Sequence, residues 1–314
     1  MTSSGQNIQD GGPLLPEAAD LGRRAAQDAV RGPAAGKPVV TRFAPSPNGA
    51  LHIGHAYAAI AAHDFAQAAG GAFLLRIEDI DGQRSRAEHI EMILADLHWL
   101  GLTWDAIIYQ SDRTDSYVSA LEQLRAAGLI YRCTCTRSDI AAALKQRPVR
   151  HGPDGPQYPG TCKGKAIDTS MPHCWRLDMA AACQVAGQMT WQDMEAGAQD
   201  ANPAIFGDVV LWRKDSPASY HLAATVDDAA GGITHVVRGR DLFAYTGLHR
   251  LIQRLLALQE PVYWHHVLIR DTDGEKLSKS RKSEGLRVIR NTGIDGADLA
   301  ASLRRGELPL GMSR

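Results

Sequence analysis

The stretch that decides the fold is Arg42-Phe-Ala-Pro-Ser-Pro-Asn-Gly-Ala-Leu-His-Ile-Gly-His55. Apolar, β-prone residues precede it, prolines and a glycine predict a turn within it, and an alanine-rich helical pattern runs from about Gly54 to Ala69. The predicted order is therefore strand, turn, helix. Such a junction directs backbone N–H groups and the positive end of the helix dipole toward an anion, and His52 and His55 both face it. Gly54 would leave room for an adenine or a ribose to lie against the backbone.

A second segment, Lys276-Leu-Ser-Lys-Ser280, offers two cations far along the chain. Taken alone, His-x-x-His occurs by chance and Lys-Leu-Ser-Lys is usually a solvated loop. Together, and in this order, they resemble the two signature motifs of class I aminoacyl-tRNA synthetases, and the longer first string resembles the glutamyl/glutaminyl branch. The resemblance covers about residues 38 to 285. It implies an α/β protein with a Rossmann-like parallel sheet and a zinc-containing inserted α/β segment.

The residues that follow the first helix fit such a sheet. Apolar residues at 73–75 predict a second strand, which ends at Arg76-Ile-Glu-Asp-Ile-Asp81. Apolar spacing predicts helices over 85–100 and 116–129. This strand–helix–strand–helix opening favours a parallel, doubly wound sheet with ligands above the carboxyl ends of the strands. By itself, the acidic string is equally typical of a strand followed by a helix cap.

The second half of the chain contains two further strings. Residues 206–228 show two strand-like runs joined by a turn, so Tyr220 is expected near the beginning of a strand, where a tyrosine is most often a core residue. Residues 233–242 predict a buried strand that ends at Arg238, followed by a helix over 246–258. Arg238 is then either a surface cation or the group that holds a substrate carboxylate. A last helical pattern covers 296–305.

Cysteines and a tyrosine follow the second helix in the pattern Cys133-Thr-Cys135 and Tyr158-Pro-Gly-Thr-Cys162. Spacing alone is equally compatible with ordinary reduced thiols in a loop and with thiolates that share an ion. The resemblance implies a structural Zn²⁺ held by Cys133, Cys135, Tyr158 and Cys162. Tyrosine is an unusual ligand, so His151 stays an alternative fourth ligand. The other two cysteines, Cys174 and Cys183, are expected to be buried small residues.

The resemblance also implies roles for single residues, and the residue types suit glutamate and ATP. Arg42 would hold the side-chain carboxylate of L-glutamate, Glu78 and Tyr220 the ammonium, and Arg238 a carboxylate. The expected glutamate-binding residues are Arg42, Phe43, Ala44, Pro45, Ser46, Glu78, Tyr220 and Arg238. The expected ATP-binding residues are His52, Gly54, His55, Lys276 and Lys279, of which His52, His55 and Lys279 would be catalytic. Mg²⁺ would accompany ATP.

Length and composition favour an ordinary globular protein. The chain has 314 residues, 44% of them hydrophobic, and a formal net charge of −1, which neither indicates nor excludes an RNA partner. No run is long enough for a membrane span and no signal sequence is visible, so we expect a cytoplasmic protein without a membrane partner or a stable protein partner. Five cysteines in such a chain argue against a disulfide framework. The predicted divisions are a loose extension over 1–37 with one short helix over 16–30, halves of the catalytic domain over 38–130 and 222–314, and an insertion over 131–221.

The acceptor of the glutamate is predicted from the 34 residues after Ser280, which leave no room for the anticodon-binding region of full-length glutamyl-tRNA synthetases. The resemblance is accordingly to branch members that attach glutamate to the queuosine base in the anticodon loop of tRNA(Asp). The alternatives are a truncated synthetase that charges a tRNA 3′ end, a non-catalytic RNA-binding regulator, and another nucleotidyltransferase. Basic residues that would meet RNA phosphates are Lys145, Arg147, Arg150, Lys163, Lys165, Arg281 and Lys282.

Overall fold

The computed structural model describes residues 16–17, 20–21, 23–24, 36–82, 84–146, 148–270, 285–308 and 312–313. The segment that contains Lys276 and Lys279 lies outside these residues, as do Arg147, Arg281 and Lys282. Most of the expected extension over 1–37 lies outside them too, but residues 20, 21, 23 and 24 are described and are helical, within the short helix expected over 16–30.

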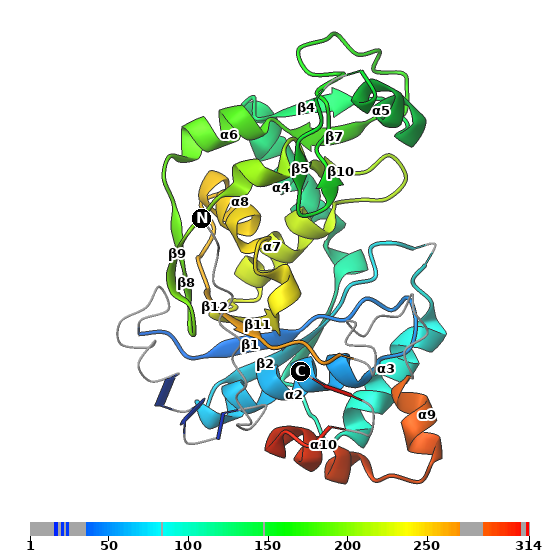
Figure 1. Ribbon diagram of the computed structural model, residues 1–314, viewed down its shortest axis with the longest axis vertical. Coiled ribbons are helices and arrows are strands. Elements are labelled where there is room, and N and C mark those ends of the chain that lie inside the picture. The colour runs from blue at the N-terminus through cyan, green and yellow to red at the C-terminus, as the bar shows by residue number, and fades with distance from the viewer. Residues whose placement is uncertain are drawn as a thin grey trace.

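A parallel sheet crosses the lower half of the molecule (Figure 1). Strand β1 (Val40–Phe43) pairs with β2 (Ala72–Ile77), which pairs with β3 (Ala106–Tyr109). Strand β11 (His235–Gly239) pairs in parallel with β12 (Val262–His266). The two groups meet where the Thr234 amide donates to the Val40 carbonyl at 3.0 Å and the Val40 amide donates to Thr234 Oγ1 at 2.8 Å. The expected parallel sheet is confirmed, and β3 extends it at a place where no strand was predicted.

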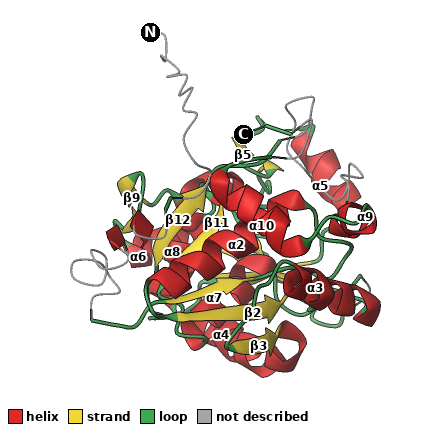
Figure 2. Ribbon diagram, turned by 90° about the horizontal axis from the view of Figure 1, so that it is seen from below, coloured by secondary structure: helices red, strands yellow, loops and turns green. Residues whose placement is uncertain are grey.

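Helices cover both faces of this sheet. One face carries α2 (Ile53–Ala68), α3 (Ala87–Trp99), α9 (Leu286–Asn291) and α10 (Gly296–Arg305), with α2 and α10 in front of the strands in Figure 2. The other carries α4 (Thr114–Ala126), α7 (Tyr220–Ala230) and α8 (Thr246–Leu255). Short 3₁₀ turns cover Gln110–Arg113, Pro203–Phe206 and Arg240–Leu242. The described helices include none that is both long and apolar enough to cross a membrane.

Helix α2 lies close to the sheet because its buried face is made largely of alanines. Ala56, Ala59 and Ala62 are fully buried, and the larger Ile60 and Phe65 fill the space between them. This packing fixes the position of the helix's first turn, which carries His52 and His55. The strand, turn and helix predicted at 39–69 are confirmed.

Helix α7 corrects the second strand-like run expected in 206–228. Only the first run is a strand, β10 (Val210–Trp212), and Tyr220 is the first residue of a helix. Ser219 caps that helix, because its side chain accepts a hydrogen bond from the Leu222 amide at 3.5 Å. The run is apolar on nearly every side because it is buried between the sheet and α8, and such burial hides the helical period.

The segment expected as an insertion forms the upper part of Figure 1. Its antiparallel sheet contains β4 (Ile130–Cys133), β7 (Cys174–Leu177) and β10, and it carries α5 (Arg137–Leu144), α6 (Met179–Ala186) and the short strands β5 (His151–Gly152) and β6 (Gly155–Pro156). Strands β8 (Thr190–Asp193) and β9 (Gly197–Asp200) form a hairpin, and β8 pairs with β12. The predicted insertion therefore also contributes a strand to the edge of the main sheet, and its limits at 131 and 221 stay a prediction.

Candidate active site

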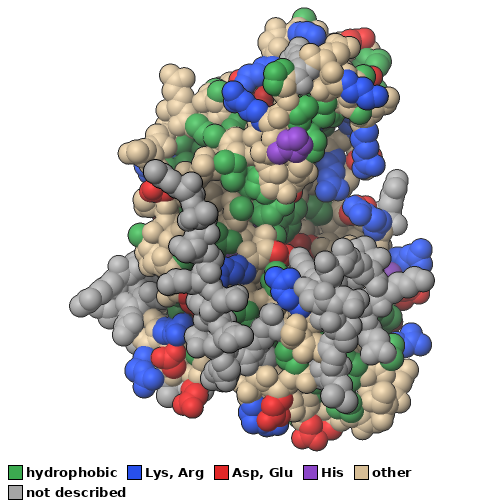
Figure 3. Space-filling model, in the orientation of Figure 1, with side chains coloured by type: hydrophobic (Ala, Val, Ile, Leu, Met, Phe, Trp, Pro, Cys, Tyr) green, Lys and Arg blue, Asp and Glu red, His purple; other side chains and the backbone are tan. Residues whose placement is uncertain are grey.

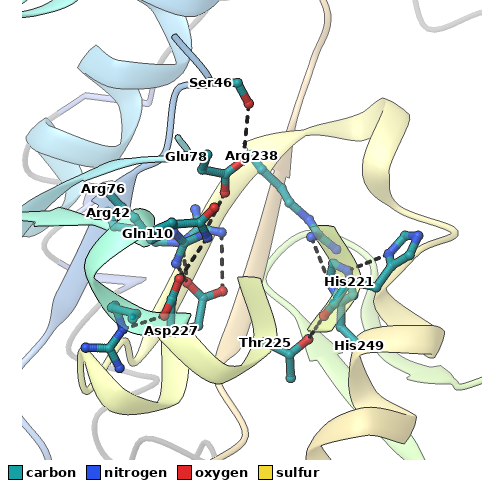
Figure 4. A network of polar contacts seen from close by, with 12 residues as sticks. Arg42, Ser46, Arg76, Glu78, Gln110, His221, Thr225, Asp227, Arg238 and His249 are labelled. Carbon is teal, nitrogen blue, oxygen red and sulfur yellow. Dashed lines mark hydrogen bonds and ion pairs between the residues drawn. The ribbon is translucent and has the colours of Figure 1, made fainter. Parts of the chain in front are cut away.

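Two buried arginines share one carboxylate at the carboxyl ends of β1 and β2 (Figure 4). Asp228 lies near the end of α7. Its Oδ1 accepts hydrogen bonds from Arg42 Nε at 2.9 Å and from Arg76 Nη1 at 2.5 Å. Arg76 also donates to Glu78 at 3.1 Å, and Arg42 donates to the Val237 carbonyl at 3.2 Å. The charges of Arg42 and Arg76 outweigh the effect of burial and lower the pKa of Asp228. Two cations and two carboxylates thus balance each other, and Arg42 is held rigidly.

A small pocket opens beside this network. It has a volume of about 110 Å³, and Ser46, Glu78 and Tyr220 are among its lining residues. Ser46 Oγ donates to Glu78 Oε2 at 3.4 Å, and the Glu78 amide donates to the Pro45 carbonyl at 3.0 Å, so the turn after β1 and the end of β2 are fastened together. Burial raises the pKa of Glu78, and Arg76 opposes that rise only in part. The structure therefore places Ser46, Glu78 and Tyr220 around one pocket beside the Arg42–Asp228 pair, and binding of an ammonium there stays a prediction.

Arg238 has a different environment at the end of β11. It is 6% exposed, and it donates to His265 Nε2 at 3.1 Å, His249 Nδ1 at 3.1 Å, Thr246 Oγ1 at 2.7 Å and the Leu242 carbonyl at 3.2 Å. All four are neutral acceptors, because burial lowers the pKa of His265 to about 4 and that of His249 well below its ordinary value. No carboxylate among the described residues forms an ion pair with Arg238. A surface position is thus excluded, and the predicted contact of Arg238 with a substrate carboxylate stays a prediction.

Asp227 ties together the elements around the pocket. Its carboxylate accepts hydrogen bonds from Gln110 Nε2 at 2.7 Å, Arg113 Nε at 2.6 Å and the Tyr117 hydroxyl at 2.7 Å. These donors come from the end of β3 and the start of α4, whereas Asp227 belongs to α7 (Figure 4). The adjacent acidic residues Asp227 and Asp228 therefore fix α7 from opposite sides.

His52 and His55 stand at the first turn of α2. Their rings stack with centroids 3.7 Å apart, and the His52 amide donates to His55 Nδ1 at 3.1 Å. A Cβ atom at Gly54 would lie 3.0 Å from the His52 ring, so glycine favours this position of the ring, and the expected room for an adenine or a ribose stays a prediction. Gly285 forms an isolated bridge with His52, and the Leu286 amide donates to the Leu51 carbonyl at 2.7 Å. Gly285, the first described residue after the segment that contains Lys276 and Lys279, therefore lies beside the two histidines.

The three predicted thiols converge at the end of β4. The sulfur atoms of Cys133, Cys135 and Cys162 lie within 4.8 Å of one another. The Tyr158 hydroxyl lies 3.2 Å from the Cys133 sulfur and 3.5 Å from the Cys135 sulfur, and it accepts the Cys162 amide at 2.9 Å. Sulfur ligands of a tetrahedral Zn²⁺ are about 3.8 Å apart. The cluster of three thiols can hold a metal ion, and the Tyr158 oxygen lies beside it, so its role as the fourth ligand stays a prediction.

His151 does not join this cluster. It is an exposed residue of β5 that pairs with Pro156, and the group of potential metal ligands among the described residues does not include it. Cys174 lies across from Cys133 in the paired strands and is buried, as expected. Hydrogen bonding by the Cys174 thiol, together with that of Tyr158, outweighs burial and lowers the pKa of Cys133 to about 3. Cys183 is half-buried in α6.

Comparison with known proteins agrees with this geometry. Residues 38–312 match the family described as tRNA synthetases class I (E and Q), catalytic domain. The chain is 47% identical over 272 residues to the glutamyl-Q tRNA(Asp) synthetase of Rhodobacter capsulatus, which covers 83% of this chain and 98% of that relative. The chain belongs to this family. The glutamyl-Q tRNA(Asp) synthetase of Burkholderia cenocepacia is 41% identical over 276 residues, which cover 86% of this chain and 90% of that relative.

Solved structures of class I synthetases have the same fold. The glutamate tRNA ligase of Elizabethkingia meningosepticum, in complex with its amino acid, superposes with a TM-score of 0.66 at 28% identity. The match covers 78% of this chain and 53% of the ligase, so this chain spans about half of the ligase's length. The methionyl-tRNA synthetase of Mycobacterium tuberculosis, with a TM-score of 0.53 at 14% identity, shares the fold alone.

The sequence patterns did not predict roles for several residues that surround the buried arginines of the candidate active site. Asp228 pairs with Arg42 and Arg76, and Asp193 accepts from His265, which in turn accepts from Arg238. The only signal for Asp228 is its place in an Asp-Asp pair within an otherwise apolar run. A buried aspartate in such a run needs a cationic partner, but the sequence does not say which.

Proposed function

We propose that this chain activates L-glutamate with ATP and transfers the glutamyl group to the queuosine base in the anticodon loop of tRNA(Asp). The observation that carries the choice of an amino acid with two carboxylates is the presence of two buried guanidiniums, Arg42 and Arg238, of which Arg238 has only neutral hydrogen-bond acceptors. The choice of acceptor is supported by relatives named glutamyl-Q tRNA(Asp) synthetase, one of which is matched over 98% of its length.

In the proposed complex, the two ends of glutamate are held by groups of opposite charge. Arg238 takes a carboxylate, and Arg42, oriented by Asp228, directs its remaining N–H groups to the side-chain carboxylate. Glu78 and Tyr220 receive the ammonium, and the backbone from Phe43 through Ala44 and Pro45 to Ser46 forms the wall beside it. Fixed charges at both ends favour glutamate over its neutral analogue glutamine.

Activation requires the α-carboxylate of glutamate to attack the α-phosphate of ATP, which gives glutamyl-adenylate and pyrophosphate. His52 and His55, with the N-terminus of α2, would donate to the phosphate oxygens as negative charge develops there. Gly54 lets this turn pack on the His52 ring. Lys276 and Lys279 would neutralise the leaving pyrophosphate, and Mg²⁺ would accompany ATP. The acceptor hydroxyl then attacks the glutamyl carbonyl and AMP leaves.

The cysteine cluster is proposed to hold one structural Zn²⁺. Three thiolates and the Tyr158 oxygen complete a tetrahedral set, and soft sulfur ligands suit this ion. The ion would connect the end of β4 to the loop that contains Tyr158 and Cys162. No role in the reaction is assigned to it.

The test of the proposed function is glutamate transfer followed by digestion of the RNA to nucleosides. The purified protein, ATP and labelled glutamate are incubated with queuosine-containing tRNA(Asp). We expect the enzyme that acts on this tRNA to be cytoplasmic. Mass spectrometry should find glutamate on the queuosine nucleoside, and tRNA(Asp) without queuosine should stay unlabelled. Glutamate on the terminal adenosine of tRNA(Glu), with queuosine unmodified, would instead establish a truncated glutamyl-tRNA synthetase. Absence of glutamate-dependent ATP–pyrophosphate exchange would favour a non-catalytic regulator.

A further inference from the structure

A second, larger pocket adjoins the small pocket beside Glu78. It has a volume of about 770 Å³ and lies between the loop after β2 and the loop after β10. The two pockets share Ile80, Asp81, Arg84 and Arg213. Because they share one wall, a group bound in the larger pocket can reach the amino-acid pocket. Figure 3 shows a hollow in the middle of this face of the molecule, lined largely by hydrophobic side chains, with basic side chains along its right edge.

Arginines dominate the polar lining of the larger pocket. Arg84, Arg137 and Arg213 line it together with Asp81 and Asp215. Asp81 already pairs with Arg84 and lies 3.6 Å from Arg213. No carboxylate among the described residues forms an ion pair with Arg137, which is exposed at the first turn of α5. Guanidinium groups in such a position are suited to bidentate contacts with phosphate.

The walls of this pocket are fastened to the rest of the molecule. Ser216 Oγ donates to the Ile80 carbonyl at 3.1 Å, which joins the loop after β10 to the loop after β2. Lys214 donates to the carbonyls of Thr134 at 2.5 Å and Cys135 at 3.0 Å, which joins the same loop to the residues that precede α5. Arg137 and Arg213 are thus presented from a fixed frame, as a preformed binding site requires.

We propose that this pocket receives the acceptor nucleotide of the RNA, with Arg137 and Arg213 contacting the phosphates on either side of it. The inference rests on the proposed function, because it assumes that an RNA hydroxyl must reach glutamyl-adenylate. A pocket of this size holds a nucleotide, and its polar walls suit a ribose and phosphates better than an apolar ligand.

Another basic pocket provides the comparison. Arg125, Arg132 and Lys165 line it with Tyr131 and Trp175, but it shares no residue with the amino-acid pocket. Of the cations expected to meet RNA, Lys163 is paired with Asp178 at 2.6 Å. Position therefore favours Arg137 over these residues as a contact near the reacting nucleotide.

The experiment compares Arg137→Ala and Arg137→Glu with Arg125→Glu, an exposed charge reversal in the other pocket. Two reactions are measured: glutamate-dependent ATP–pyrophosphate exchange without RNA, and transfer to a queuosine-containing anticodon stem-loop. Arg137 does not line the amino-acid pocket, so exchange should stay within about twofold, while kcat/KM for transfer falls roughly 10-fold or more through KM for RNA. Fluorescence anisotropy with the same stem-loop should show that Arg137→Ala reduces the slope of log Kd against log salt by roughly 0.7 to 1.

Unchanged RNA affinity in Arg137→Glu, or an equal loss in Arg125→Glu, would overturn the inference. A parallel fall in exchange would also overturn it, because it would show that the substitution disturbs the adenylate site. If the unsubstituted protein shows no exchange with glutamate, the proposed function fails, and the anisotropy measurement still decides whether Arg137 contacts RNA. The two failures are therefore distinguishable.

Discussion

Arg238 donates from Nε to Nε2 of His265 at 3.1 Å, and this contact keeps the guanidinium oriented without neutralising it. The other ring nitrogen of His265 lies 2.7 Å from Asp193 Oδ2, so that nitrogen carries the proton and Nε2 is the acceptor. Burial lowers the pKa of His265 to about 4, which keeps the ring neutral at physiological pH. Arg42, in contrast, is paired directly with Asp228. The two arginines expected to bind glutamate therefore contribute differently: Arg238 supplies net charge and Arg42 supplies geometry.

This difference predicts the effects of substitution on amino-acid choice. Glutamate should support ATP–pyrophosphate exchange, and glutamine barely, because a guanidinium left against a neutral amide costs roughly 2 to 4 kcal/mol. Arg42→Ala should lower kcat/KM for glutamate by about that free energy and narrow the preference over glutamine, because Arg42 is assigned to the side-chain carboxylate. Arg238→Gln should also lower exchange. Arg254→Gln, on the exposed side of α8, serves as the control. Comparable exchange with both amino acids in the unsubstituted protein would contradict this assignment.

The shared carboxylate predicts a large loss of stability. Asp228→Asn removes the charge that Arg42 and Arg76 both contact, and it leaves two buried guanidiniums to compete for Glu78. The free energy of unfolding should fall by roughly 3 to 5 kcal/mol, as for other buried ion pairs that lose one partner. Urea denaturation measures it, with the exposed Asp215→Asn as a control that should change stability by less than about 0.5 kcal/mol. Equal stability of the two variants would show that the arginines are satisfied in another way.

The cysteine cluster predicts stoichiometric metal. Purified protein should contain one zinc per chain, and Cys133→Ser or Cys135→Ser should abolish it and lower the melting temperature, because the ion connects β4 to the following loop. Elemental analysis and thermal unfolding test this. Cys183→Ser, whose thiol lies outside the cluster, should retain the metal. Normal zinc content in Cys133→Ser would show that this thiol is no ligand.

A buried histidine predicts part of the pH dependence of stability. Burial lowers the pKa of His235 to about 4, so between about pH 6.5 and 4 the unfolded chain binds a proton that the folded chain does not. The unfolding free energy should accordingly fall as pH decreases through that window, by about 1.4 kcal/mol per pH unit from this residue. His235→Gln should reduce the slope by that amount. Urea denaturation between pH 7 and pH 5 gives both slopes, and identical slopes would refute the assignment.

The first half of the fold and much of the site were predictable because they depend on local patterns. Strand, turn and helix over 39–69 follow from apolar spacing and turn residues, and Arg42, His52 and His55 keep fixed positions relative to that junction. The second strand-like run after β10 misled because burial on all sides removes the period that distinguishes a helix from a strand. The hydrogen bond that the Ser219 side chain accepts caps the first turn, and this cap favours a helix over a strand.

The sequence by itself determined the family, the order of the elements around His52 and His55, and the residue types that can bind glutamate, ATP and a metal. Only the tertiary structure decided which buried polar side chains pair with one another. Asp228 is 186 residues from Arg42, and Asp193 is 72 residues from His265, so neither partnership leaves a mark in local spacing. Burial makes such pairings necessary, because a polar or charged group removed from water must find a hydrogen-bond partner.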